Sequence, residues 1–263
     1  MPIALVSAAI GAFLYLPLAV VLVFSFNNSR HGGAWREFTT EWYRTLWHNP
    51  AALNAATNTL ILAAASTVVA TFLGTLLALG LNRGRFRGKS ACELSLLVPV
   101  IIPDIVMAVA LLMFFYLVRE ALGVLQPGLL TMILAHITFE IPFVTMIVRA
   151  RLRGLDPALE EAARDLGANS WQTFRRVKFP LLRPGILAGA LLAFTLSLDD
   201  FIVSFFTTGP GATTLPILIY SSVKRGITPD INALSSVLIV IAIASASLLN
   251  LLQRRRETTY RGD

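Results

Sequence analysis

The stretch DPALEEAARDLGANSWQTFRRVKFP, residues 156–180, lies between two long apolar runs and carries a helical pattern of its own. Asp156 is a favourable residue for the N-cap of a helix, and Pro157 suits the first helical position. Gly167 predicts the end of this helix, because glycine adopts the left-handed conformation that closes a helix. A second short helix is expected over about 170–177, ending before the last proline of the stretch. The pattern therefore predicts a compact elbow of two helices joined by a glycine turn.

Apolar runs dominate the rest of the chain. Of its 263 residues, 56% are hydrophobic and 14% are charged, whereas soluble chains are about 45–50% apolar and about 25% charged. Six runs reach the roughly 20 residues that are needed to cross a membrane. These runs are residues 3–26, 58–81, 94–118, 128–148, 184–206 and 233–252. We expect an all-α integral membrane protein, with residues 1–263 forming a single transmembrane domain of six transmembrane helices and a cytoplasmic elbow.

Basic residues are distributed unevenly between the connections. All 22 Lys and Arg residues lie outside the six predicted spans, and 16 of them lie in residues 82–93, 149–183 and 253–263. Basic residues accumulate on the cytoplasmic side of a membrane. We therefore expect these segments and both termini to be cytoplasmic. The low charged fraction disfavours a soluble nucleic-acid binder, and the single cysteine excludes a disulfide-bonded scaffold.

The elbow resembles a known motif. The elbow contains the pattern E-A-A, three residues, G, nine residues, a β-branched residue, one residue and F-P. The residues that form this pattern are Glu161, Ala162, Ala163, Gly167, Val177, Phe179 and Pro180. It resembles the EAA loop of binding-protein-dependent ABC importer permeases, in which Ile and Leu usually stand at positions 177 and 179. The resemblance implies a type I ABC importer permease fold and a coupling helix that docks on a separate ATPase chain. The ATPase-coupling residues it implies are Glu161, Ala162, Ala163, Gly167 and Pro180. The alternative is an amphipathic helix on the lipid surface.

Four acidic residues lie within the predicted spans, namely Asp104, Glu140, Asp199 and Asp200, and His136 lies beside them. An ionisable residue at the centre of a transmembrane helix costs at least about 2.5–3.5 kcal/mol on insertion scales, so it indicates function by default. No Lys or Arg lies within a span to pair with these acids. We predict that the four carboxylates line a substrate pathway suited to a cationic solute.

Each of these acids also has a structural interpretation. Asp104 follows a proline and would cap a helix that resumes after a break. Glu140 and His136 are four residues apart on one helical face, so they would pair with each other. Asp199 and Asp200 are adjacent and point about 100° apart, so only one of them would face a pathway.

The sequence around the aspartate pair resembles a narrower group, the permease subunits of spermidine/putrescine importers of the PotC type. The segments that carry this resemblance are residues 195–200, 208–211, 215–216, 220–224 and 232–234, with 103–108 and 136–139 upstream. It implies a subunit of a polyamine importer in the bacterial inner membrane. The implied partners are a second homologous permease, two copies of an ATP-binding subunit and an external substrate-binding protein, besides the lipid bilayer. No nucleic acid is expected. Gly209-Pro210-Gly211 would meet the binding protein, gate the path or form an ordinary turn.

ATP hydrolysis is not expected on this chain. Residues 84–90, GRFRGKS, have three residues between the two glycines, whereas a phosphate-binding loop needs four and follows a strand. We therefore expect no enzyme activity, catalytic residue, metal or cofactor here, with ATP and Mg²⁺ bound by the partner ATPase. The alternatives are an importer permease for another small solute, a proton-coupled secondary transporter and an intramembrane aspartyl protease. The last lacks a Gly-x-Gly-Asp signature, since Ser197-Leu198 precede Asp199.

Overall fold

The computed structural model describes residues 2–29, 34–83, 86–226, 229–241 and 243. Over this part of the chain the regular structure is helical, and the β pairing consists of an isolated bridge between Asn27 and Phe38. The chain divides into two compact units, one formed by Met1–Leu53 with Leu218–Asp263 and the other by Asn54–Ile217.

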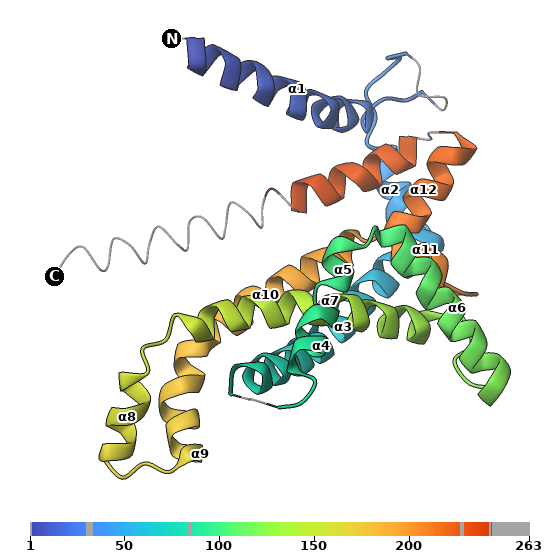
Figure 1. The fold of residues 1–263 in the computed structure, drawn as a ribbon. Helices are drawn as coiled ribbons and strands as arrows, with labels where there is room; N and C mark the ends of the chain where they lie inside the picture. Colours follow the sequence, from blue (N-terminus) through green and yellow to red (C-terminus); the bar gives the residue numbers. More distant parts are fainter. Residues whose placement is uncertain (1, 30–33, 84–85, 227–228, 242, 244–263) are drawn as a thin grey trace. The chain divides into compact units, whose positions relative to one another are not determined.

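The second unit contains the helices that form the elbow and carry the four acids (Figure 1). These elements are α3 (Pro50–Arg83, beginning in the first unit), α4 (Lys89–Ser95), α5 (Val98–Ile101), α6 (Asp104–Leu122), α7 (Leu129–Arg153), α8 (Ala158–Asp165), α9 (Ser170–Thr173), the π-helix η1 (Phe174–Lys178), α10 (Phe179–Asp199) and α11 (Ile202–Thr207). The first unit contains α1 (Pro2–Phe24), α2 (Glu41–Trp47), most of α12 (Leu215–Arg225) and an apolar helix at Pro229–Ile241.

Asn27 organises the connection between α1 and α2 in the first unit. Its buried side chain donates from Nδ2 to the carbonyl of Ala34 (2.8 Å) and accepts from the amide of Arg36 at Oδ1 (2.9 Å). Its own carbonyl accepts a hydrogen bond from Trp42 Nε1 (2.9 Å). These bonds satisfy buried polar groups of a loop that would otherwise lack partners.

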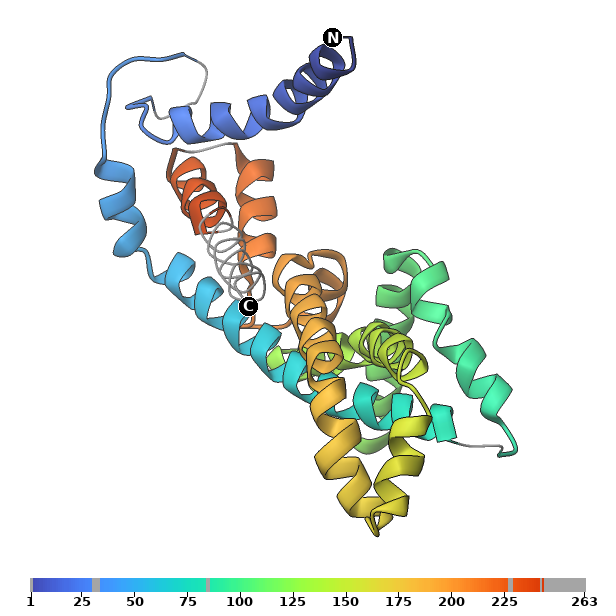
Figure 2. The ribbon, with the colours of Figure 1, turned by 90° about the vertical axis from the view of Figure 1, so that its left-hand side faces the viewer.

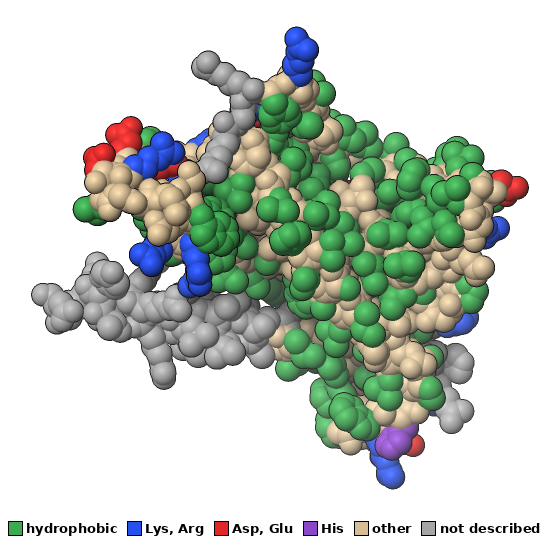
Figure 3. Space-filling model, turned by 90° about the horizontal axis from the view of Figure 1, so that it is seen from below, with side chains coloured by type: hydrophobic (Ala, Val, Ile, Leu, Met, Phe, Trp, Pro, Cys, Tyr) green, Lys and Arg blue, Asp and Glu red, His purple; other side chains and the backbone are tan. Residues whose placement is uncertain are grey.

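Five described helices are long and apolar enough to cross a membrane. They correspond to the first five predicted runs, and the part of the sixth that the structure describes belongs to the shorter helix Pro229–Ile241. Residues 242 and 244–252 of that sixth run lie outside the described residues. Hydrophobic side chains cover much of the face shown in Figure 3, with charged side chains at its margins. A surface of this kind is matched to lipid or to other apolar helices.

Two of the predicted spans are interrupted. The third breaks at Ile102 and Pro103, as the proline predicts, and α6 begins at Asp104. The fifth, which the sequence suggests is continuous, ends its first helix at Asp199, and α11 begins only at Ile202. The cause is local, because the Asp200 side chain accepts the first free amides of α11 and competes with helix continuation.

Close packing of α3, α7 and α10 depends on glycines. A Cβ on Gly74 of α3 would lie 2.9 Å from Val144 Cβ of α7, and a Cβ on Gly189 of α10 would lie 3.3 Å from Val144 Cγ1. Val144 is fully buried, in a cluster that also includes Val148 and Leu182. Small residues allow helices to approach closely where no hydrophobic effect drives them together.

The elbow forms a hairpin that projects beyond the ends of α7 and α10 in both ribbon views (Figures 1 and 2). Asp156 Oδ1 accepts a hydrogen bond from the amide of Ala158 (2.9 Å), which agrees with the predicted N-cap. Gly167 has a positive φ of 80°, and the amide of Ala168 donates to the carbonyl of Ala163 (3.0 Å). This is the glycine-closed helix end that the sequence predicts.

The second arm of the elbow differs from the prediction, because it does not end before Pro180. One helix continues from Ser170 to Asp199 through the π segment η1, where the amide of Phe179 donates to the carbonyl of Phe174. A proline removes one amide donor and clashes with the preceding turn. The wider π turn directly before Pro180 accommodates this change, so the helix continues where an ideal α-helix would break.

Candidate functional site

A buried polar cluster centres on His136 of α7, whose side chain is fully buried. Its Nδ1 lies 2.7 Å from Ser197 Oγ of α10, and its Nε2 lies 3.0 Å from Ser204 Oγ of α11. Nε2 is also 3.4 Å from Asp200 Oδ2. The imidazole ring therefore contacts both helices of the interrupted fifth span and the residue at the break between them.

Glu140 lies one turn further along α7 and is also fully buried. Ser66 Oγ of α3 donates to Glu140 Oε1 (2.8 Å) and lies 3.2 Å from Ser197 Oγ. His136 Nδ1 is 3.9 Å from the same carboxylate oxygen, so the predicted pairing of Glu140 with His136 is confirmed. Glu140 Oε2 is buried without a hydrogen-bond partner among the described residues. The cluster thus joins α3, α7, α10 and α11.

Asp199 and Asp200 lie in different surroundings. Asp200 accepts hydrogen bonds from the amides of Val203 (3.2 Å) and Ser204 (2.7 Å) and so caps α11. Asp199 is the last residue of α10, and its side chain is exposed. The adjacent residues therefore differ in their surroundings, since Asp200 is held by the protein and Asp199 is accessible.

Asp104 is exposed and is the first residue of α6, directly after the break at Pro103. Ala108, four residues later, belongs to the same buried apolar cluster as Val203 of α11. Asp199 in turn lies four residues before Val203. The structure therefore brings Glu140 and Asp200 together around His136. Asp104 lies one turn before Ala108 on α6, whereas the break at Asp200 separates Asp199 from Val203.

Sequence reasoning missed the serines of this cluster, Ser66, Ser197 and Ser204, all of which are buried. Ser197, Asp200 and Ser204 recur at three and four residues, the spacing of one helical face, which is a signal that points to a shared polar face. Ser66 lies among small residues and carries no such signal.

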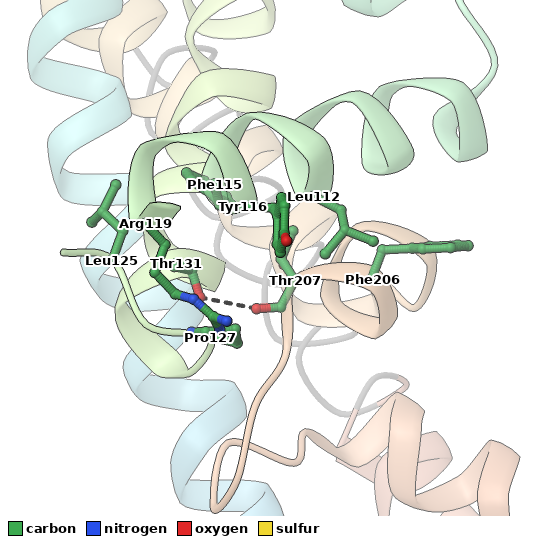
Figure 4. Close-up of a pocket in the computed structure, with 9 residues that line it drawn as sticks. All are labelled: Leu112, Phe115, Tyr116, Arg119, Leu125, Pro127, Thr131, Phe206 and Thr207. Carbon is green, nitrogen blue, oxygen red and sulfur yellow. Dashed lines mark hydrogen bonds between the residues drawn. The ribbon is translucent and has the colours of Figure 1, made fainter. Parts of the chain in front are cut away.

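A small cavity lies where α6, α7 and α11 meet (Figure 4). It is lined by Leu112, Phe115, Tyr116, Arg119, Leu125, Pro127, Thr131, Phe206 and Thr207. Thr131 Oγ1 donates to the carbonyl of Thr207 (3.0 Å) beside it. The cavity has a volume of about 50 Å³, which is far below the roughly 300–1,000 Å³ of small-molecule sites. A cavity of this size is too small to enclose such a molecule.

The loop after α11, which contains Gly209-Pro210-Gly211, is a packed turn. Asn58 Nδ2 of α3 donates to the carbonyls of Gly211 (2.9 Å) and Thr213 (3.0 Å). Thr59 Oγ1 accepts from the amide of Leu215 (2.9 Å). The backbone of Gly209 lies against that of Pro127. These contacts favour the interpretation of the segment as a structural turn.

The elbow residues form an exposed surface. Leu166 and Trp171 are large apolar side chains of this hairpin that are 89% and 65% exposed. Of the five coupling residues that the motif implies, Ala163 is half-buried and four are exposed, namely Glu161, Ala162, Gly167 and Pro180. Glu160 contacts Lys178 and Arg164, and so ties the two arms together from within.

The basic connection at residues 84–90 leads from α3 into α4. Residues 84 and 85 lie outside the described residues, and Gly88 precedes α4 with a positive φ of 93°. On α4, Glu93 pairs with Arg149 of α7 (2.5 Å). Across the described part of the chain, no three His, Cys, Asp or Glu side chains are grouped so that they could hold a metal ion.

Comparisons with known proteins agree with this arrangement. The family profile described as "Binding-protein-dependent transport system inner membrane component" matches residues 70–261. The chain is 44% identical, over 97% of its length and 95% of the relative, to the spermidine/putrescine transport system permease protein PotC of Escherichia coli K12. It is 41% identical to the putrescine transport system permease protein PotI of the same organism, over 86% of this chain and 82% of that one.

A solved structure shares the fold. A chain of a bacterial ABC transporter that imports the acidic polysaccharide alginate superposes with a TM-score of 0.75, with 22% identity over 96% of this chain and 94% of that one. The predicted permease fold is thereby confirmed. The profile match and the relatives above 40% identity lead to one conclusion: the chain belongs to the binding-protein-dependent transport system inner membrane components, and is a multi-pass transport subunit rather than an enzyme.

Proposed function

We propose that this chain is a permease subunit of an ATP-driven importer that moves polyamines into the cell. The single observation that carries the proposal is the 44% identity to a spermidine/putrescine permease, because it extends over 97% of the chain. The acids near the breaks of the third and fifth spans support a cationic solute, since a carboxylate attracts an ammonium group in a region of low dielectric.

The partners of this subunit follow from the same family. We propose a second homologous permease, two ATP-binding subunits and an external binding protein that delivers the amine. The exposed apolar side chains of Leu166 and Trp171 support docking of an ATPase on the elbow. ATP and Mg²⁺ are held by that ATPase. The elbow and both termini are cytoplasmic, in accordance with the distribution of basic residues.

Asp199 and Asp104 offer transient sites to the ammonium groups of the solute. Both are exposed in the isolated chain, whereas Glu140 is buried and Asp200 is held by α11. Glu140 and Asp200 are instead held within the fold, by Ser66 and by the start of α11. ATP binding moves the elbow, the pathway opens to the binding protein, and hydrolysis restores the inward-open state.

Uptake by the complete complex in proteoliposomes tests this function. Radiolabelled spermidine should accumulate only with ATP and the loaded binding protein, and putrescine should compete while a neutral sugar should not. Accumulation of a sugar or an amino acid in place of the amines would refute polyamines as the solute. It would still be consistent with an ATP-driven importer. Uptake that a pH gradient drives without the ATPase would refute the importer itself and favour a proton-coupled transporter.

A further inference from the structure

The interrupted fifth span poses a mechanical problem. One helix continues from Ser170 in the elbow to Asp199, but Asp200 is extended, with ψ of 125°, before α11 begins. A break of this kind allows a chain to bend. Without a further connection, displacement of the elbow and α10 would be absorbed at the break, and α11 would not follow.

His136 supplies such a connection. Its two ring nitrogens contact Ser197 in the last turn of α10 and Ser204 in the first turn of α11, at 2.7 Å and 3.0 Å. A neutral imidazole has one donor and one acceptor, and a hydroxyl can be either, so both hydrogen bonds form in either tautomer. We call these three residues the His136 clamp.

The clamp is itself held in place. Ser66 of α3 contacts both Ser197 and Glu140, and Glu140 lies on the same helical face as His136. His136 and Glu140 are fully buried, and Ser66 and Ser204 are as well. Buried hydrogen bonds cost energy when they are broken without replacement, so this network resists separation of its helices.

We propose that His136 is a positioning residue that makes α11 move together with α10, so that movement of the elbow is transmitted across the break at Asp200 to α11. This inference rests on the proposed function for its consequence, which is coupling of ATP hydrolysis to transport. Its structural part, the joint movement of two helices, does not depend on the solute.

The first experiment measures how many amine molecules enter proteoliposomes per ATP hydrolysed by the full complex. In His136→Asn the amide reaches only the position of Nδ1, and in His136→Gln only that of Nε2, so each variant keeps one side of the clamp. Loss of one hydrogen bond of about 1 kcal/mol predicts a ratio lowered about fivefold in both. Thr138→Val on the same helix is the matched control, because Thr138 is exposed and bonds only within α7. A ratio equal to that of the wild type in both His136 variants would overturn the proposal.

The second experiment measures the distance between α10 and α11 directly. Spin labels at Leu187 of α10 and Phe205 of α11, both exposed, are placed in a Cys92→Ser background and compared with ATP and with ADP. The wild type should give one narrow distance distribution in both states, and His136→Ala a broad or shifted one. A distribution in His136→Ala with the same mean and width as in the wild type would refute the clamp even if uptake fell.

If His136 variants do not assemble, Ser197→Ala and Ser204→Ala each remove one hydroxyl and are measured in the same two ways. Unchanged ratios and distances in both would refute the clamp. If the wild-type complex moves no polyamine, the proposed function fails, while the spin-label distances still decide whether the clamp exists.

Discussion

The backbone of Gly209 lies so close to Pro127 that a Cβ on residue 209 would stand 2.0 Å from the carbonyl oxygen of Pro127. Gly209 belongs to the loop after α11, and Pro127 lies two residues before the start of α7. Because both partners are backbone atoms, no side-chain rotation relieves the contact.

Gly209→Ala should therefore destabilise the protein by about 1–3 kcal/mol or more, the usual cost of overpacking. The measurement is the thermal unfolding midpoint of the purified protein in detergent. The matched control is Gly80→Ala on α3, where no atom lies within 4 Å and alanine is favoured in a helix. A midpoint of the Gly209 variant at or above that of the wild type would show that the loop does not pack in this way.

The close contact between Gly74 and Val144 predicts that a substitution of Val144 restores part of the stability that a substitution of Gly74 removes. Gly74→Ala places a Cβ 2.9 Å from Val144 Cβ and 3.1 Å from the carbonyl of Ile141, so it should lower stability by about 1–3 kcal/mol. The added Cβ would also lie 2.9 Å from Val144 Cγ1, so Val144→Ala, which removes the γ methyl groups and keeps Cβ, should recover part of that loss in the double variant. A double-mutant cycle of unfolding midpoints measures the coupling, and additive effects would mean that the residues do not touch.

Substitutions of the two adjacent aspartates should have different effects, one on stability and the other on transport. Asp200→Ala removes the acceptor of two amides at the start of α11 and should cost about 0.5–2 kcal/mol. Asp199→Asn removes an exposed charge, and should lower spermidine uptake while leaving the unfolding midpoint within error. Uptake assays and thermal unfolding of both variants give the comparison. Normal uptake by assembled Asp199→Asn would exclude this carboxylate from the pathway.

The elbow should bind the ATPase through Leu166. Leu166→Asp places a charge on a side chain that is 89% exposed, so it should weaken association with the ATPase at least about tenfold without changing the unfolding of this chain. Gly167→Asp should also weaken association, because residue 167 has a positive φ that an L side chain adopts at a cost. Leu122→Asp, at another exposed leucine, is the control. Co-purification of the ATPase at the wild-type level with Leu166→Asp would argue against docking there.

Much of the fold could be predicted from the sequence, since apolar runs and basic connections obey simple physical rules. Asp156 and Gly167 bound the first helix of the elbow as their local preferences predict. The continuation through Pro180 could not be predicted, because a π turn compensates for the proline and leaves no mark in the composition.

The site was predictable only in part. The spacing of His136 and Glu140 indicated that they pair, and it was the break in the fifth span that brought Asp200 to the same ring. The role of Ser66 depends on α3 packing beside α7, a contact between residues 74 positions apart that no local pattern encodes.

The hydrogen bonds of Asn58 have a consequence for the time course of synthesis. Its partners, the carbonyls of Gly211 and Thr213, lie 153 and 155 residues later in the chain. At about 5–20 residues per second, a ribosome needs roughly 8–30 s to supply them. The contact between α3 and the loop after α11 therefore forms only after the intervening helices have been synthesised.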